Sequence, residues 1–225
     1  MRQARYNLRL VRRWTLVLLV AVVSAGSAGR AEAVVAMGPY LDFSSGNGTF
    51  KWDSDNKDFD VDMNSGAFGF ALDSSKGDQS NFSYRLNVGI ERQNLKDQSD
   101  VNMKMGGGVL ENVFAFAMIR QPEMRWWVGP LLRIGYYGGE SDEYHNTDGD
   151  RCKTESNLVE FGVGVATGIN LKIGPHIYLA PSAGVRFIGV AGTGTIKNLD
   201  LHSQYDDDFS GNLTSFFANF SLLFD

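Results

Sequence analysis

Six charged residues stand on rows that are rich in small side chains, and they are the first candidates for chemistry in this sequence. They are Arg85, Glu91, Glu111, Arg133, Glu160 and Arg186. Around them apolar and small residues alternate with a period of two, which is the period of a β-strand. A charge buried without a partner is costly, so inward-facing carboxylates and guanidiniums should pair. We expect Glu160 to pair with Arg133 or Arg186 on neighbouring strands, and Glu111 to join if its strand keeps its phase. Such pairs either fill an interior or gate it.

Histidine offers little for catalysis in this chain. His145 and His202 fall in predicted loops and His176 in a turn, where single histidines are usually solvated. The stretch 162–168, GVGVATG, resembles a phosphate-binding loop, but no helix follows it. We therefore predict no catalytic residue, and we interpret these glycines as residues that leave space inside the protein.

Metal, redox and cofactor sites are also not predicted. Acidic residues cluster in predicted loops at 53–55, 142–143, 148–150 and 206–208, but none matches the calcium-loop pattern D-x-[DN]-x-[DN]-G. They could at most share divalent cations with lipopolysaccharide phosphates. The chain has one cysteine, Cys152, so an internal disulfide and C-x-x-C motifs are excluded. We expect Cys152 to be an incidental loop thiol.

The first 33 residues have the pattern of a secretory signal peptide. Five arginines precede an apolar core at 14–23, and Ala31-Glu32-Ala33 forms an A-x-A cleavage site. Its removal would lower Lys+Arg from 21 to 15 and Asp+Glu from 26 to 25, which gives the mature chain a net charge of −10. This acidity argues against nucleic-acid binding. We predict a signal peptide at 1–33 and one domain at 34–225.

The mature sequence reads as eight strands separated by turns. We place the strands at 35–44, 59–72, 82–92, 103–119, 125–137, 157–171, 177–191 and 213–225. Short connections at 74–80, 120–124 and 172–176 alternate with longer polar loops at 45–58, 93–102, 138–156 and 192–211. In the second strand the apolar phase changes near residues 64–66, which suggests a β-bulge.

One row of each clear strand is apolar, and the other is rich in Gly and Ala with isolated Arg and Glu. None of the residues on the apolar rows at 82–90, 126–136, 159–169, 177–189 and 216–224 is charged. A narrow barrel interior has the composition of the second row, whereas a solvated face would be rich in lysine. If lipid covers the apolar rows, the sheet must close, because unpaired strand edges are too costly in hydrocarbon.

The final stretch, LTSFFANFSLLFD, ends the chain with an amphipathic strand. Phe216, Ala218, Phe220, Leu222 and Phe224 form its apolar row, and Asp225 follows. With the signal peptide and the eight strands, this ending resembles the small outer-membrane β-barrels of the OmpA transmembrane-domain, OmpX and OmpW type. The resemblance implies an eight-stranded antiparallel up-and-down transmembrane barrel with short periplasmic turns and longer extracellular loops. It also implies an assembly signal at Phe216, Phe220, Leu222 and Phe224, read by the barrel-assembly machinery.

The same resemblance places the protein in the bacterial outer membrane, in contact with outer-membrane lipid and lipopolysaccharide, and we expect a monomer. Aromatic residues near strand ends suit the two membrane interfaces. We expect the girdles to comprise Phe82, Trp126, Trp127 and Phe224 at the periplasmic end, and Phe50, Trp52, Tyr136 and Tyr137 at the outer end.

Three functions fit this sequence. The favoured one is a structural or surface-interaction role through the extracellular loops, with a lumen filled by side chains. The alternative is a narrow channel for small or hydrophobic solutes, as the OmpW-like resemblance suggests. A lipid A-modifying enzyme is the least favoured, since the adjacent His202-Ser203 pair departs from the H-x-S pattern of the deacylase barrels.

Overall fold

The protein is built from long antiparallel strands. The computed structural model describes residues 35–54, 58–74, 81–146 and 148–225, so the predicted signal peptide lies outside the described residues. Its strands are β1 (Ala36–Trp52), β2 (Asp58–Asp73), β3 (Phe82–Asp97), β4 (Asn102–Gln121), β5 (Met124–Ser141), β6 (Tyr144–His145), β7 (Arg151–Gly174), β8 (Ile177–Asn198) and β9 (Ser203–Phe224). The two-residue β6 pairs only with the start of β7. No helix of the described residues has the length and hydrophobicity to cross a membrane.

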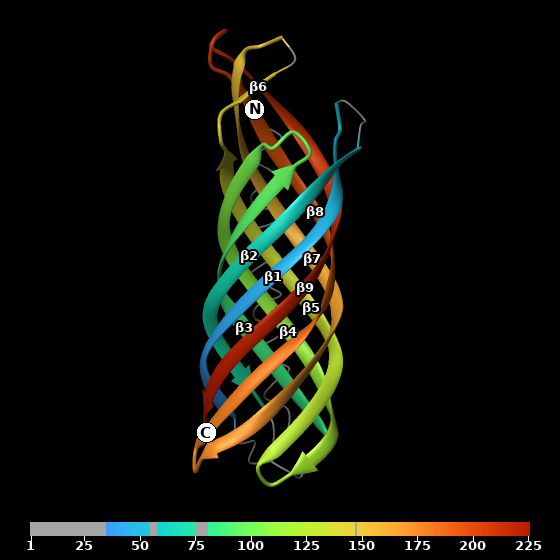
Figure 1. Cartoon of the computed structure of the whole chain (residues 1–225), viewed down its shortest axis with the longest axis vertical. Helices are drawn as coiled ribbons and strands as arrows, with labels where there is room; N and C mark the ends of the chain where they lie inside the picture. Colours follow the sequence, from blue (N-terminus) through green and yellow to red (C-terminus); the bar gives the residue numbers. More distant parts are fainter. Residues whose placement is uncertain (1–34, 55–57, 75–80, 147) are drawn as a thin grey trace, which may run out of the picture. The chain divides into compact units, whose positions relative to one another are not determined.

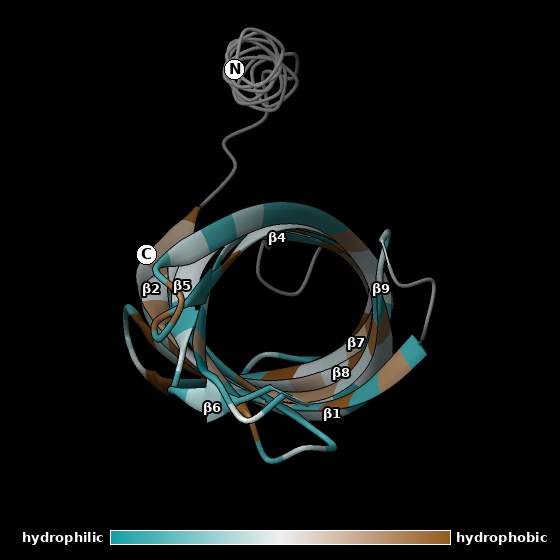
Figure 2. Cartoon of the chain, turned by 90° about the horizontal axis from the view of Figure 1, so that it is seen from above, coloured by the Kyte–Doolittle hydropathy of each residue, from teal (hydrophilic) through white to brown (hydrophobic). Residues whose placement is uncertain are grey.

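Eight of these strands close into a ring (Figure 2). Each pairs with its neighbours in chain order, β5 pairs with β7 across β6, and β9 pairs with β1. A path that starts at Leu41 on β1 and passes from each residue to its partner on the next strand returns to β1 at Lys51. The shear of the barrel, which is this displacement along β1, is therefore ten residues. Eight strands with this shift tilt by about 41° and form a barrel of about 8 Å backbone radius. Such an interior is just wide enough for side chains.

The strands are longer than the sequence predicted, and most of the predicted outer loops are strand. β1 continues to Trp52, β5 to Ser141 and β8 to Asn198, so the hairpins project well beyond the middle of the barrel (Figure 1). The predicted bulge at residues 64–66 is wrong, because β2 pairs in continuous register with β1 and β3. The register shift of the β4–β5 pair lies between Ala117 and Ile119 instead.

The lower part of the barrel carries an apolar band on its outward surface. On β7 the outward row runs from Val159 to Ile169 and includes Phe161, Val163 and Val165, of which Phe161 is 57% exposed. Ten residue steps at this tilt correspond to about 25 Å along the barrel axis, the height of the apolar band in outer-membrane barrels. β7 as a whole spans about 57 Å by the same arithmetic, so the barrel rises far above the band.

Above the band the two faces exchange character. On β2, Phe68 and Phe70 point outward, whereas Val61 and Met63 point inward and are 3% and 2% exposed. This exchange of faces produced the apparent change of phase in the sequence. Lipid covers the lower strand segments, so their outward residues are apolar, while water surrounds the upper segments, so their apolar residues turn inward. The strand itself stays regular.

Glycines on the inward rows make room for the few large rings in the lumen. A Cβ on Gly168 would lie 2.5 Å from the indole of Trp127, and one on Gly135 would lie 2.4 Å from the ring of Tyr137. Both distances are shorter than van der Waals contact. The interpretation of the glycines at 162–168 as residues that leave interior space agrees with this packing.

Candidate functional site in the barrel lumen

The centre of the lumen holds a network of charged side chains from six strands. Arg186 of β8 is 1% exposed and lies between two carboxylates. Its Nη1 and Nη2 donate to Oδ1 and Oδ2 of Asp42 on β1, both at 2.9 Å, and its Nε donates to Oε2 of Glu111 on β4 at 2.8 Å. The guanidinium carbon also lies 3.8 Å from the ring centroid of Phe217 on β9. A planar guanidinium suits this two-sided arrangement, because its fork matches a carboxylate in bidentate geometry.

Arg133 of β5 forms the second half of the network. Its Nη2 pairs with Oε2 of Glu91 on β3 and donates to the hydroxyl of Tyr137 at 2.9 Å. Tyr137 in turn donates to Glu91 at 2.7 Å. Nε of Arg133 lies 3.6 Å from Oε2 of Glu160 on β7, and its Nη1 lies 4.0 Å from Glu111, which joins the two halves. Gln93 completes this half by donating to Oε1 of Glu160 at 2.9 Å.

The structure places all six predicted residues inside the barrel and brings five of them together. The expected partnership of Glu160 with an arginine of a neighbouring strand is present with Arg133, and Glu111 is inside because β4 keeps its phase. Arg85 stands apart, nearer the end of the barrel that carries the C-terminus. Its guanidinium lies 5.8 Å from the ring centroid of Trp127, and Nη2 reaches the carbonyl of Ala180 at 3.5 Å.

Sequence reasoning missed three members of the network: Asp42, Gln93 and Tyr137. Asp42 lies on the inward row of β1 between Tyr40 and Ser44, and that position was the signal that could have identified it. Across the described ranges, buried carboxylates also outnumber buried cations by one. Among the described residues the buried carboxylates are Asp42, Asp73, Glu91, Glu111 and Glu160, and the buried cations are Arg85, Arg125, Arg133 and Arg186.

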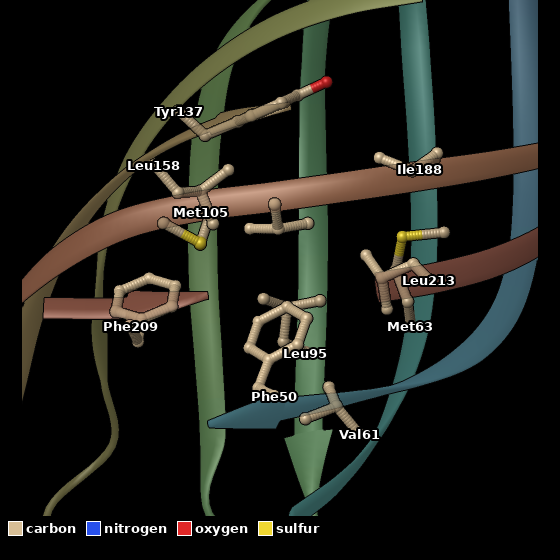
Figure 3. Packing of buried hydrophobic residues seen from close by; sticks show 11 residues of the cluster. Phe50, Val61, Met63, Leu95, Met105, Tyr137, Leu158, Ile188, Phe209 and Leu213 are labelled. Atoms are coloured by element: carbon tan, nitrogen blue, oxygen red, sulfur yellow. The ribbon is translucent and has the colours of Figure 1, made fainter. Parts of the chain in front are cut away.

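An apolar plug fills the lumen above the charged network (Figure 3). It consists of the buried side chains Phe50, Val61, Met63, Leu95, Met105, Tyr137, Leu158, Ile188, Val190, Phe209 and Leu213, with Trp52, Phe59 and Met103 packed against it. The rings of Phe50 and Phe209 are stacked at 5.9 Å, and Trp52 meets Phe209 edge to face at 5.1 Å. The prediction that Phe50 and Trp52 face the membrane interface is therefore wrong, since Phe50 is 4% exposed and lies inside.

Together the network and the plug leave little open space along the axis. A cavity at the network has a volume of about 10 Å³ and is lined by Tyr40, Asn87 and members of the network. This is room for about one water molecule. The network and the plug therefore fill two successive levels of the lumen with packed side chains.

The predicted aromatic girdle is only partly on the outside. Phe82, Trp126, Tyr136 and Phe224 are exposed on the outward surface, by 44%, 39%, 56% and 44%. Trp127 and Tyr137 are 1% and 0% exposed, so their assignment to the girdle is wrong. Trp127 follows the outward Trp126, and Tyr137 follows the outward Tyr136. Because consecutive residues of a strand point to opposite faces, the second ring of each pair points into the lumen.

The predicted assembly-signal residues Phe216, Phe220, Leu222 and Phe224 lie on the outward row of β9, between β8 and β1. Asp225, which departs from an aromatic ending, folds back on the preceding turn. Its carboxylate accepts a hydrogen bond from the hydroxyl of Tyr178 at 3.0 Å and lies 3.0 Å from Nδ1 of His176. The extra residue is thus accommodated without disturbing the last strand.

The outer hairpins are tied together by polar clamps. Asp200, in the β8–β9 turn, accepts from the backbone nitrogen of Arg151 at 2.8 Å and from its Nε and Nη2 at 3.1 and 2.9 Å. The hydrogen bond from the backbone of Arg151, followed by those from its side chain, lowers the pKa of Asp200 below its ordinary value. Lys104 binds Asp142 at 2.7 Å, and Lys153 binds Glu140 at 2.9 Å. These contacts stiffen the projecting strands.

The remaining candidates for chemistry are dispersed. His145 is in β6, His202 lies in the β8–β9 turn with a φ of 53°, and Cys152 is buried at the start of β7 rather than in a loop. In the described ranges no three or more His, Cys, Asp or Glu side chains are placed to hold a metal ion. Of the predicted acidic runs, 53–55 falls partly outside the described residues, and the others lie at the outer end of the barrel.

Comparison with known proteins finds similar folds at low sequence identity. No family model matches the chain, and no curated protein matches it in sequence. The outer membrane protein OprG from Pseudomonas aeruginosa has a TM-score of 0.45 at 11% identity, over 84% of this chain and 97% of that one. The translocator domain of the autotransporter NalP from Neisseria meningitidis has a TM-score of 0.41 at 11% sequence identity, and the match covers 96% of each chain. Neisserial surface protein A has a TM-score of 0.29 at 13% sequence identity, and the match covers 81% of this chain and 97% of that one.

The structure on its own indicates a membrane-spanning barrel. Its ring is closed, its strands are antiparallel in up-and-down order, and the outward surface carries an apolar band of membrane height. In such barrels the short turns are periplasmic and the longer hairpins extracellular, so the end with the C-terminus is the inner end. The protein is therefore an eight-stranded antiparallel transmembrane β-barrel of the outer-membrane type.

Proposed function

We propose that this barrel is a sealed membrane anchor that presents its outer hairpins as a rigid, acidic contact surface outside the cell. The observation that carries the proposal is the filled lumen, in which the charged network is followed by the apolar plug. An open pore would need a continuous wetted path, whereas these two layers occupy the axis one above the other.

The charge of the outer part supports a surface role. Across residues 51–62, 92–104, 138–157 and 191–212, described acidic residues outnumber basic ones sixteen to seven. Asp206, Asp207 and Asp208 follow one another on β9, where Asp206 and Asp208 accept hydrogen bonds from Thr195 and Thr193. Strand pairing and clamps hold these charges in place, so a partner meets a preformed surface. Such a surface favours a basic partner and gives salt-dependent binding.

A direct test compares binding with transport in one preparation. Vesicles that contain the barrel should bind a basic probe, oligolysine, more tightly than vesicles that contain the D206N/D207N/D208N variant, and the difference should shrink as salt is raised. The same vesicles should release small sugars no faster than protein-free vesicles. Equal binding by the two barrels would contradict the surface role, and solute-specific release would contradict the seal.

A second candidate is a narrow path for apolar solutes. It is favoured by the methionines Met63, Met103 and Met105 at the plug, because their flexible side chains adapt to different occupants. Uptake of an apolar dye into barrel-containing vesicles would support this candidate. We propose no catalytic role; mass spectrometry of lipid A from cells with and without the protein should show the same species, and a new lipid A species would contradict this.

A further inference from the structure

A groove of about 540 Å³ runs along the outward face of β7, β8 and β9. Residues of all three strands line it, among them Val159, Phe161, Val163, Phe187, Gly189 and Asn212. Its size lies within the range of small-molecule sites, which is about 300–1,000 Å³. The lining is almost entirely apolar, and none of its residues belongs to the charged network.

The groove exists because Gly189 has no side chain. Gly189 lies on the outward row of β8, paired with Phe161 on β7 and with Asn212 on β9. A Cβ at this position would meet only the carbonyl oxygen of Phe161, at 3.8 Å. Phe161 of β7 lies beside Gly189, and Phe187 lies two residues along β8 on the same outward row; they are 57% and 55% exposed. They form two walls, and the bare strand at Gly189 forms the floor.

The groove continues the lipid-covered surface and reaches its upper edge. Its lower end, at Val163 and Phe187, lies within the apolar band. At its upper end Val159 pairs with Ala191, which pairs with Ser210, so an apolar residue of β7 shares a cross-strand row with a polar residue of β9. The outward row of β9 has already become polar at Thr214 and Asn212. The apolar surface therefore extends higher on β7 and β8 than on β9.

We propose that this groove binds one acyl chain of an outer-leaflet lipid, with the lipid's polar head beside Asn212. The groove opens onto the surface that acyl chains already cover, which makes a hydrocarbon chain its natural occupant. Within the band the chain contacts two walls and a floor instead of a convex strand surface, and such packing favours association in lipid. At the upper edge of the band the chain also covers Val159 and Ala191 from water.

The test fills the groove with a side chain and counts bound lipid. Gly189→Phe should fill it without touching the lumen, because its Cβ position is open toward the outside. The matched control is Gly108→Phe on β4, on the opposite side of the ring, which is also outward and whose Cβ would meet only a carbonyl oxygen at 4.0 Å. Each barrel is purified from outer membranes in mild detergent, and acyl chains per barrel are measured by gas chromatography of fatty-acid esters.

The wild type and G108F should retain one more lipid molecule per barrel than G189F, seen as an excess of all the acyl chains which that lipid carries. The double variant F161A/F187A, which removes the walls and keeps the glycine, should also lose that lipid. Heat-dependent gel mobility verifies that each barrel is folded. Equal chain counts in all the folded barrels would overturn the proposal, and so would a wild-type dimer that G189F converts to monomer, because a second copy would then occupy the groove.

Discussion

Removal of the guanidinium of Arg186 should strongly destabilise the barrel. Arg186→Met keeps the apolar stem but withdraws three hydrogen bonds of 2.8–2.9 Å from two carboxylates, Asp42 and Glu111, which are 2% and 3% exposed. Breaking a buried ion pair from one side costs about 3–5 kcal/mol, because the remaining charge stays buried without a partner. Since two carboxylates lose their closest partner here, we expect the upper part of that range.

The assay is equilibrium unfolding by urea in lipid vesicles, followed by tryptophan fluorescence. A variant that also neutralises both partners, R186M/D42N/E111Q, should recover more than half of the lost free energy of unfolding. Arg151→Met, which breaks an exposed clamp, should cost no more than about 1 kcal/mol. If Arg186→Met changed the free energy of unfolding by less than about 1 kcal/mol, the description of the lumen as a tightly coupled network would be refuted.

Three further predictions concern packing, charge and pH. Gly168→Val should prevent stable folding because its side chain would overlap a buried indole, whereas the outward Gly106→Val should fold normally; gel mobility of the two variants decides this. Glu160→Gln should raise the urea midpoint, because it removes the one buried carboxylate in excess of the four arginines buried in the described part of the chain. An unchanged midpoint would count against electrostatic coupling between Glu160 and the rest of the network. Because the pKa of Asp200 is lowered in the folded state, its clamp with Arg151 contributes stability above the ordinary Asp pKa and loses it as pH falls through the lowered value. Hydrogen exchange of the β8–β9 hairpin should therefore accelerate only in strong acid, and acceleration near neutral pH would contradict this.

The sequence predicted the barrel because a lipid-covered strand has an unambiguous pattern. Phe216 to Phe224 on β9 and Val159 to Ile169 on β7 alternate without a charged residue on the outward row, and closure follows from the chemistry of the bilayer. The ends of the strands were not predicted, because outside the bilayer a polar outward row looks like a loop. Val61 and Met63 thus appeared as a bulge, although only the surroundings of the strand had changed.

Parts of the lumen were predictable for the same reason, and others were not. Arg133 and Glu160 lie on rows rich in glycine and alanine. Because the opposite row of each strand is apolar and faces lipid, these charged side chains must point into the lumen. Asp42 falls inside the strand predicted at 35–44, but this strand is not among those whose rows were compared for charge, so Asp42 was not counted as an interior charge. Tyr137 and Trp127 were assigned to the girdle on residue type, although strand parity places each opposite its outward neighbour. Which arginine meets which carboxylate depends on the ten-residue shift of the ring, which no local pattern encodes.

The central claim is that side chains seal the lumen of the closed barrel. Electrical recording on refolded protein in a planar lipid bilayer tests it most directly. With the charged network and the apolar plug both in place, the barrel should add no steady conductance to the bilayer at moderate voltage. Reproducible ohmic steps from the folded, wild-type barrel would contradict the claim, because ions would then have a continuous path through the lumen.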